Sequence, residues 1–512
     1  MASAGAGKFM KKTLINRGGW RGSWTKMLVS LFLAWQGVEI QFGAARAQTN
    51  VTIIYNFGGH YDPSTQTITN VQGINPYSGV IPSGNTLYGT TTYYGNTGVT
   101  DGGSVYKINT DGTGFATLYS FSTPVDDLAL SERGSTNSDG ATPYGRLLLA
   151  DGALYGTTTA GGLYGSGVIF KINPDGTGFT NLYNFAPRAY DSALALTNAD
   201  GYGPEGALII SGNTLYGTTE YGGPNNAGTV FAVTTNGTGF ATLHSFTWLG
   251  EGGLPRSALT LIGGTLYGTA ASGGQVWANG SIFQVNTDGS GFQTLFNFGG
   301  GSSDTNAAGM APIGGLLLLG NTFYGTAADG GTNGSGDGTI YSINTDGSGF
   351  TTLHNFNGTD GYQPEADLTY YNGVLYGTTS AGGDLAGTIF RINTDGTSFT
   401  NLYTFTGGDD GDRVYSSLVV ADNVFYGTAY SGGSGFEGTV FGMTVPQNPP
   451  PPPQYLGIER NDNNLVLSWT NSALRLQSAN LITGPFNIVP GASSPFTNTV
   501  GAGQQFFRLV QQ

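Results

Sequence analysis

The 512-residue sequence contains no cysteine, only three histidines and few charged residues, which make up 10% of the chain. Without cysteine there can be no disulfide framework, no cysteine-ligated zinc or iron–sulfur centre and no thiol nucleophile. His60, His244 and His354 are far apart and form no spaced ligand pair, so a histidine metal site or a Ser-His-Asp triad has little support. Any catalysis would therefore depend on carboxylates, Tyr or Arg.

Glycine and aromatic residues are abundant instead. The sequence has 88 glycines, 28 tyrosines and 29 phenylalanines, which is far more glycine than ordinary proteins contain. The aromatic side chains supply ample material for a core, and the low charge is unlike that of a disordered polyampholyte. The composition therefore predicts a folded chain.

The N-terminal region has the features of a secretory signal peptide. Basic residues precede an apolar run from Met27 to Trp35, and Ala45-Arg46-Ala47 forms a small-x-small cleavage site. An amphipathic or transmembrane helix is the alternative, but the run is shorter than the roughly 20 residues that a membrane span needs. We therefore expect cleavage after residue 47 and a secreted, extracellular or cell-surface location.

Cleavage there would leave a strongly acidic protein. Residues 1–47 hold seven of the 18 basic residues and one of the 32 acidic residues, so 11 basic and 31 acidic residues remain, a net charge of −20. Such a chain would be repelled by nucleic acid and by anionic membrane surfaces. We expect a monomer with no nucleic-acid partner, no integral membrane span in the mature chain and no cofactor.

The string Leu-Tyr-Gly-Thr or Phe-Tyr-Gly-Thr occurs seven times. Its tyrosines are spaced by 67, 61, 51, 57, 52 and 50 residues, at Tyr88, Tyr155, Tyr216, Tyr267, Tyr324, Tyr376 and Tyr426. Asp-Gly turns between alternating segments are strong hairpin signals. Each unit therefore predicts four short strands, the arrangement of a propeller blade, as in 366–371, 375–378, 387–393 and 400–405.

The two ends of the repeat region predict how the ring closes. The seventh unit stops after its third strand, Thr439 to Val445, and an unmatched fourth strand, Ile53 to Phe57, precedes the first unit. Pairing these two strands would leave no open sheet edge at the seam. The sequence therefore predicts an all-β, seven-bladed β-propeller of four-stranded blades closed by the N-terminal strand. A linear β-solenoid is the alternative, although its coils are usually much shorter.

The remaining chain predicts a linker and a second domain. Pro446 and the run from Pro449 to Pro453 indicate a stiff, extended spacer. Strand patterns after it suggest a small β-sandwich-like domain with Trp469 as a core residue, and we expect little packing between this domain and the ring. The predicted divisions are the signal peptide 1–47, the propeller 48–445, the Pro-rich linker 446–454 and the C-terminal β domain 455–512.

Several strings recur in one order across the units: Leu-Tyr-Gly-Thr-Thr, Gly-Gly, Gly-Thr-Ile-Phe and Asn-Thr-Asp-Gly-Thr. This series resembles the Gloeo/Verruco (GloVer) tandem repeat of exported bacterial proteins, and the resemblance covers residues 51–445. The closing segment Phe506 to Leu509 is similar to small C-terminal β domains of comparable secreted proteins. The resemblance implies a fold and an exported location, with no established activity and no catalytic residues.

A frame of the form acid-Gly-x-x-Pro leads into the first strand of most units, as at Asp139 to Pro143 and Asp360 to Pro364. We interpret it as a turn whose carboxylate accepts backbone N–H bonds, with glycine at positive φ and proline at the start of the strand. A ring of carboxylates around a cation near the axis is the alternative. Gln72 and Ala308 replace the acid in two units and disfavour that alternative, so we expect no metal site.

The residue after the proline position differs between units, whereas the residue that follows it is always small. If the first strands line the axis, the variable position surrounds one mouth of the channel. Three Tyr, two Glu and one Arg would form a concave surface suited to stacking sugar rings and binding hydroxyls, although an ordinary solvated rim is the alternative. The candidate ligand-binding residues are Tyr77, Tyr144, Glu205, Arg256, Glu365 and Tyr415.

We therefore predict a secreted or cell-surface binding or interaction scaffold for an extracellular glycan or protein ligand, with no assigned catalytic residue. The alternative is an extracellular carbohydrate-active hydrolase or lyase that uses carboxylates at the channel mouth, where Glu205 and Glu365 could approach each other. Two carboxyl groups with shifted pKa values converging with an Arg or Tyr would favour the enzyme. We interpret His244 and His354 as surface residues of outer strands.

Overall fold

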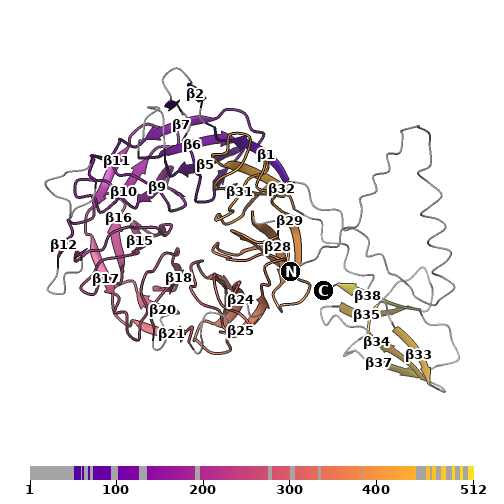
Figure 1. Cartoon of the computed structure of the whole chain (residues 1–512). Coiled ribbons are helices and arrows are strands. Elements are labelled where there is room, and N and C mark those ends of the chain that lie inside the picture. Colours follow the sequence, from indigo (N-terminus) through magenta and orange to yellow (C-terminus); the bar gives the residue numbers. More distant parts are fainter. Residues whose placement is uncertain are drawn as a thin grey trace, which may run out of the picture. The chain divides into compact units, whose positions relative to one another are not determined.

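The computed structural model describes residues 51–445, apart from 59, 63–66, 70–72, 94–101, 126–134, 191–195, 275–278, 300–305, 333–335 and 384–385, together with the strands between 457 and 511. The described residues form strands, turns and loops without any helix. Figure 1 shows four-stranded sheets arranged as a ring around a central axis. The predicted signal peptide and Pro-rich linker lie outside the described residues.

Seven antiparallel four-stranded sheets make up the ring, and in six of them the strands follow chain order. The first three blades consist of β4 (Ile81–Ser83), β5 (Thr86–Thr91), β6 (Ser104–Asn109) and β7 (Ala116–Ser120); β8 (Leu148–Ala150), β9 (Ala153–Thr158), β10 (Val168–Ile172) and β11 (Thr180–Asn184); and β14 (Ile209–Ser211), β15 (Thr214–Thr219), β16 (Thr229–Thr234) and β17 (Ala241–Ser245).

In blades 4 to 7, as in blades 1 to 3, a short first strand is followed by three longer strands. They consist of β18 (Thr260–Ile262), β19 (Thr265–Ala270), β20 (Ser281–Asn286) and β21 (Gln293–Asn297); β22 (Leu317–Leu319), β23 (Thr322–Ala327), β24 (Thr339–Asn344) and β25 (Thr351–Asn355); β26 (Thr369–Tyr371), β27 (Val374–Thr379), β28 (Thr388–Asn393) and β29 (Thr400–Thr404); and β30 (Val419–Ala421), β31 (Val424–Ala429), β32 (Thr439–Thr444) and β1 (Val51–Asn56). The predicted seven-bladed propeller is confirmed.

The N-terminal strand β1 is the outer strand of the last blade, whose strand order is β1-β32-β31-β30. The register runs from Val51 opposite Met443 to Asn56 opposite Thr439, with an irregularity between residues 53 and 55. The N–H of Phe57 then donates to the carbonyl of Gly438 at 2.9 Å, and the Phe57 side chain is fully buried. The ring therefore closes as the sequence predicts.

The core lies between neighbouring blades, where apolar side chains of facing sheets pack together. The glycine of each Leu-Tyr-Gly-Thr string lies beneath an aromatic ring of the third strand of its own blade. At Gly217, for example, a Cβ atom would approach Cζ of Phe231 to 2.6 Å, too close for any larger residue without displacement of the ring. This contact explains why glycine occupies the position in all seven units.

Aromatic stacking links most outer strands to the next blade. Tyr119 of β7 stacks on Phe179 of the following hairpin with ring centroids 3.7 Å apart, and His244 of β17 stacks on Phe292 in the same way at 3.5 Å. The side chains of His244 and His354 are only 16% and 18% exposed. The placement of these histidines on outer strands is confirmed, but they are not surface residues, because each packs against the next blade in the place of a tyrosine.

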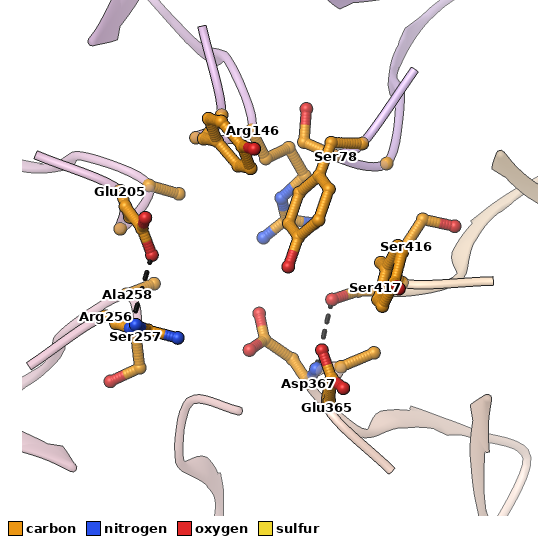
Figure 2. Close-up of a pocket in the computed structure, with 18 of the residues that line it drawn as sticks. Ser78, Arg146, Glu205, Arg256, Ser257, Ala258, Glu365, Asp367, Ser416 and Ser417 are labelled. Atoms are coloured by element: carbon orange, nitrogen blue, oxygen red, sulfur yellow. Dashed lines mark hydrogen bonds and ion pairs between the residues drawn. The ribbon is translucent and has the colours of Figure 1, made fainter. Parts of the chain in front are cut away.

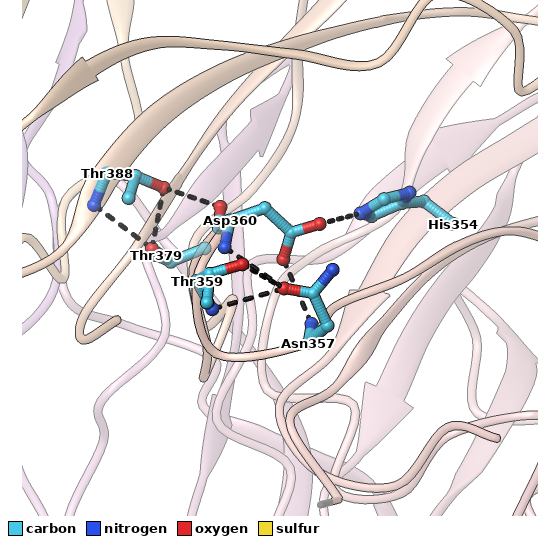
Figure 3. A network of polar contacts seen from close by, with 6 residues as sticks. All are labelled: His354, Asn357, Thr359, Asp360, Thr379 and Thr388. Carbon is cyan, nitrogen blue, oxygen red and sulfur yellow. Dashed lines mark hydrogen bonds and ion pairs between the residues drawn. The ribbon is translucent and has the colours of Figure 1, made fainter. Parts of the chain in front are cut away.

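The carboxylates of the acid-Gly frame belong to these same links. Asp360 accepts the backbone N–H of Asn357 at 2.9 Å and lies 3.0 Å from Nε2 of His354 (Figure 3). Asp139 likewise accepts the hydroxyl of Tyr119 at 2.8 Å. The interpretation of a turn with glycine at positive φ and a carboxylate that accepts a backbone N–H is confirmed. The placement of the proline at the start of the strand is wrong, because Pro143 and Pro364 lie five residues before β8 and β26. The alternative of an axial cation ring is also wrong, because the carboxylates bind outer strands. The acids in this arrangement are Asp139, Asp200, Glu251, Asp360 and Asp410.

The unit that has Ala308 in place of the acid also lacks an aromatic hydrogen-bond donor on the preceding outer strand. The preceding outer strand, β21, carries Phe296, which stacks on Phe350 at 4.0 Å but has no hydrogen-bond donor. A carboxylate at residue 308 would have no side-chain donor to accept from. In this unit the acid and its aromatic donor are therefore replaced together.

The strands after residue 456 form two three-stranded antiparallel sheets. One contains β33 (Gly457–Asn461), β34 (Asn464–Ser468) and β37 (Phe496–Thr499), and the other contains β35 (Leu474–Ala479), β36 (Asn487–Ile488) and β38 (Phe506–Gln511). Leu467 and Leu476 are buried. Trp469 lies outside the described residues, and an independent sandwich-like domain stays a prediction.

Candidate functional site: an axial cup

A tight bend of the chain lies six residues before every first strand. The residue before the proline position has a positive φ, between 52° and 64°, in all seven units. Hydrogen bonds hold this unfavourable conformation on both sides: at Leu254, the N–H donates to Ala227 and the carbonyl accepts from Ala271. The bent residues are Asn75, Thr142, Gly203, Leu254, Ala311, Gln363 and Arg413.

The variable residues that follow these bends meet around one cavity of about 100 Å³ on the axis (Figure 2). All six candidate residues line it, together with Ile313 of blade 5. We call this cavity and its lining the axial cup. The structure thus brings the candidates together, and their role in ligand binding stays a prediction.

One half of the cup is aromatic, because blades 7, 1 and 2 each contribute a tyrosine. Tyr77 is the middle ring: it stacks on Tyr415 with centroids 4.7 Å apart and tilts against Tyr144 at 4.5 Å. Tyr430, which follows β31, packs edge-on against Tyr415 at 5.7 Å. Burial raises the pKa values of Tyr77, Tyr144 and Tyr415, so their hydroxyl groups stay protonated and can donate hydrogen bonds at neutral pH.

The opposite half of the cup is charged. Arg256 forms an ion pair with Glu220, which follows β15 and is 4% exposed, and its Nε lies 3.5 Å from Oε2 of Glu205. The pKa of Glu205 is raised to about 8, mainly by burial and also by the neighbouring Glu220, whereas Arg256 opposes the shift. One guanidinium therefore holds two carboxyl groups.

Glu365 is the second acid of the cup. Burial raises its pKa to about 7, and a hydrogen bond of 3.4 Å from the hydroxyl of Ser380 opposes that shift. A carboxyl group with this pKa is present in both protonation states near neutral pH. It can therefore either donate or accept a hydrogen bond to a ligand.

A second level of the cup lies two residues further along each first-strand segment. It is formed by Gly79, Arg146, Ala207, Ala258, Gly315, Asp367 and Ser417, which all line the cavity. The sequence interpretation missed this level, although it also differs between units. Because side chains in an extended chain alternate, the second residue after a cup residue faces the same way.

A further cavity of about 230 Å³ adjoins the cup, since Arg146, Ala258, Asp367 and Ser417 line both. Its other lining residues include Ile209, Thr260, Thr369 and leucines within or just before the first strands. The channel therefore changes from an aromatic and charged mouth, through a level with one Arg and one Asp, to a section lined by both apolar and polar groups.

Within the described parts of the chain, no group of three or more His, Asp or Glu side chains is placed to hold a metal ion. The same residues contain no helix long and apolar enough to cross a membrane.

The family model of the Gloeobacter/Verrucomicrobia repeat matches residues 43–195, 132–336, 188–385 and 302–449. The chain belongs to this family. These matches span the repeat region and confirm the resemblance seen in the recurring strings. A comparison with curated protein sequences finds no match.

Two solved structures are similar to this Gloeobacter/Verrucomicrobia repeat protein at low sequence identity. A chain from the crystal structure of a nidogen/laminin complex is 14% identical, with a TM-score of 0.37, and the match covers 62% of this chain and 94% of that chain. An oligogalacturonate lyase in complex with manganese is 12% identical, with a TM-score of 0.45, and the match covers 78% of this chain and 99% of that one.

Proposed function

We propose that this protein is an extracellular or cell-surface binding protein that holds a sugar ring of a glycan in its axial cup. The observation that carries the proposal is the division of the cup into an aromatic half and a charged half. Sugar rings have an apolar face that stacks on aromatic rings and hydroxyl groups that bond to polar side chains.

The repeat architecture supports this reading of the cup. Positions that packing requires, such as Gly217 beneath Phe231, are the same in all units, whereas both levels of the cup differ from blade to blade. A uniform scaffold needs no such differences for its own stability. The cavity volume of about 100 Å³ also favours a small ring over a folded protein as the bound group.

The double variant Tyr144→Ala/Tyr415→Ala should weaken glycan binding by roughly 1–3 kcal/mol, because it removes two of the three stacking rings. Binding partners can be found on a glycan array, and affinities then measured by isothermal titration calorimetry. The matched control is Tyr190→Ala/Tyr370→Ala, which removes two exposed tyrosines that do not line the cup. Equal loss of binding in both double variants would contradict the proposal.

A carbohydrate-active hydrolase or lyase is the second candidate, and one observation favours it. Glu365 and Glu205, with pKa values of about 7 and about 8, line the same cavity as Arg256 and three tyrosines. A carboxyl group that stays partly protonated near neutral pH can act as a general acid toward a leaving oxygen. In such an enzyme Glu365 would be the acid, since Glu205 is bound to Arg256.

If the protein cleaves the glycan that it binds, Glu365→Gln should lower turnover by about 10²- to 10⁴-fold while leaving binding largely intact. The activity of the unmodified protein should fall as the pH rises above about 7, because Glu365 then loses the proton that it must donate. The measurements are release of new chain ends as a function of pH and calorimetric binding to the variant. Binding without any release of chain ends would rule out the second candidate.

A further inference from the structure

Arg146 occupies a distinctive place at the second level of the cup. It follows the bend at Thr142 in blade 2, lines both the cup and the adjoining cavity, and extends into the central space of the cup (Figure 2). Four of the seven residues at this level are glycine or alanine. These small residues leave room on the axis for a ligand group to reach the guanidinium.

The two arginines of the cup differ in their partners. Arg256 is paired with Glu205 and Glu220. Among the residues that the structure describes, none forms an ion pair or a hydrogen bond with Arg146. A guanidinium that lines a cavity without a protein partner can offer its donors to a ligand.

The other polar residues at this level are partly engaged with the protein itself. Oδ1 of Asp367 accepts the N–H of Gly315 at 2.7 Å, and the N–H of Asp367 donates to Oγ of Ser417 at 3.1 Å. The hydroxyl hydrogen of Ser417 is then free to donate toward the channel. Asp367 also places a negative charge at the same level as Arg146, which limits the negative charge that the level can accept.

We propose that the second level of the cup is a subsite for a carboxylate, and that the bound glycan presents an acidic sugar of the uronic acid class to Arg146. This inference rests on the proposed glycan-binding function. A planar guanidinium binds a planar carboxylate through two parallel hydrogen bonds. A single unpaired Arg opposite an Asp suits a monoanion, whereas a phosphate dianion would need further cations. The sugar ring lies against the tyrosines, and its carboxylate extends inward.

Titration calorimetry with matched sugars tests the subsite. The pairs are methyl glucoside with methyl glucuronide and methyl galactoside with methyl galacturonide, whose members differ only at the carboxylate position. The protein should bind the acidic member of one pair about tenfold more tightly than the neutral member, equivalent to about 1.4 kcal/mol. Arg146→Gln should abolish this preference, because the affinity for the acidic sugar should fall about tenfold relative to that for its neutral partner.

Two further variants separate the role of the guanidinium from that of charge alone. Lys171→Gln changes the net charge equally, but Lys171 lies on β10 of the same blade, over the ring of Tyr155, and should keep the preference. Arg146→Lys should keep only part of it, because an ammonium group lacks the planar pair of donors. Thermal unfolding of each variant shows whether the fold is retained.

The outcomes distinguish the subsite from the cup. Equal affinity for neutral and acidic sugars, unaffected by Arg146→Gln, would overturn the subsite while leaving glycan binding in place. Tighter binding of the corresponding 6-sulfated glucoside than of the glucuronide would overturn the assignment of a carboxylate. Failure of all four sugars to bind would overturn the proposed function together with the subsite.

Discussion

Removing β1 and Phe57 is expected to lower the free energy of unfolding of the propeller by more than about 5 kcal/mol. Truncating a fully buried Phe costs about 3–5 kcal/mol by itself, and Phe57 is fully buried. Tyr55 also stacks on Phe115 of blade 1 at 4.3 Å, so the strand joins the last blade to the first. Its loss would in addition expose the edge of β32, which favours aggregation.

Urea unfolding of a chain that begins at Gln48 and of one that begins at Gly58 measures this effect. Phe57→Ala should reproduce much of the loss, whereas Thr52→Ala, at an exposed position of the same strand, should have little effect. A synthetic peptide of residues 48–58 should restore stability to the shortened chain by adding the missing strand. Identical urea midpoints for the two chains would show that the ring does not depend on β1.

Replacing Arg256 by Met should lower stability by about 3–5 kcal/mol at pH 8, because it leaves Glu205 and Glu220 without their cation. Met keeps much of the apolar stem, so the change mainly removes charge. The matched control is Arg413→Met at a side chain that is 58% exposed, where the effect should be near zero. Differential unfolding in urea measures both variants.

The pH dependence of this loss identifies its cause. Burial raises the pKa of Glu205 to about 8, above its value in the unfolded chain, so the stability linked to its protonated form is complete below about pH 4.5 and is lost as the pH rises toward 8. Without Arg256, which holds the pKa of Glu205 down, this dependence should steepen, and the loss should shrink at pH 5. An equal loss at pH 5 and pH 8 would assign the effect to packing instead of charge.

The repeat architecture could be predicted because packing imposes the same demands on every blade. The recurring string with Gly217, the hairpin turns and the unmatched strand at Ile53 to Phe57 each report a local requirement of the ring. The pairing of an acid with an outer-strand aromatic was not predicted, because Asp360 and His354 belong to separate features of the sequence. Their relationship appears only when the blades are placed side by side.

The first level of the cup was accessible to sequence reasoning, since its residues share one position relative to the proline. The second level could also have been found by applying the two-residue alternation of a strand to that position, which leads from Tyr144 to Arg146. Glu220 and Tyr430 could not, because they follow the second strands and contact Arg256 and Tyr415 only in the folded blade. Their contribution depends on distances that sequence does not contain.

The pairing of β1 with β32 also determines when the ring can close during synthesis of the chain. A chain is synthesised from its N-terminus at about 5–20 residues per second, so β1 emerges on the order of tens of seconds before Thr439 to Thr444. The six blades built from consecutive strands can form during that interval from local hairpins. Closure must come last. A chain that ends before β32 would therefore form an open array of blades in which β1 has no partner strand.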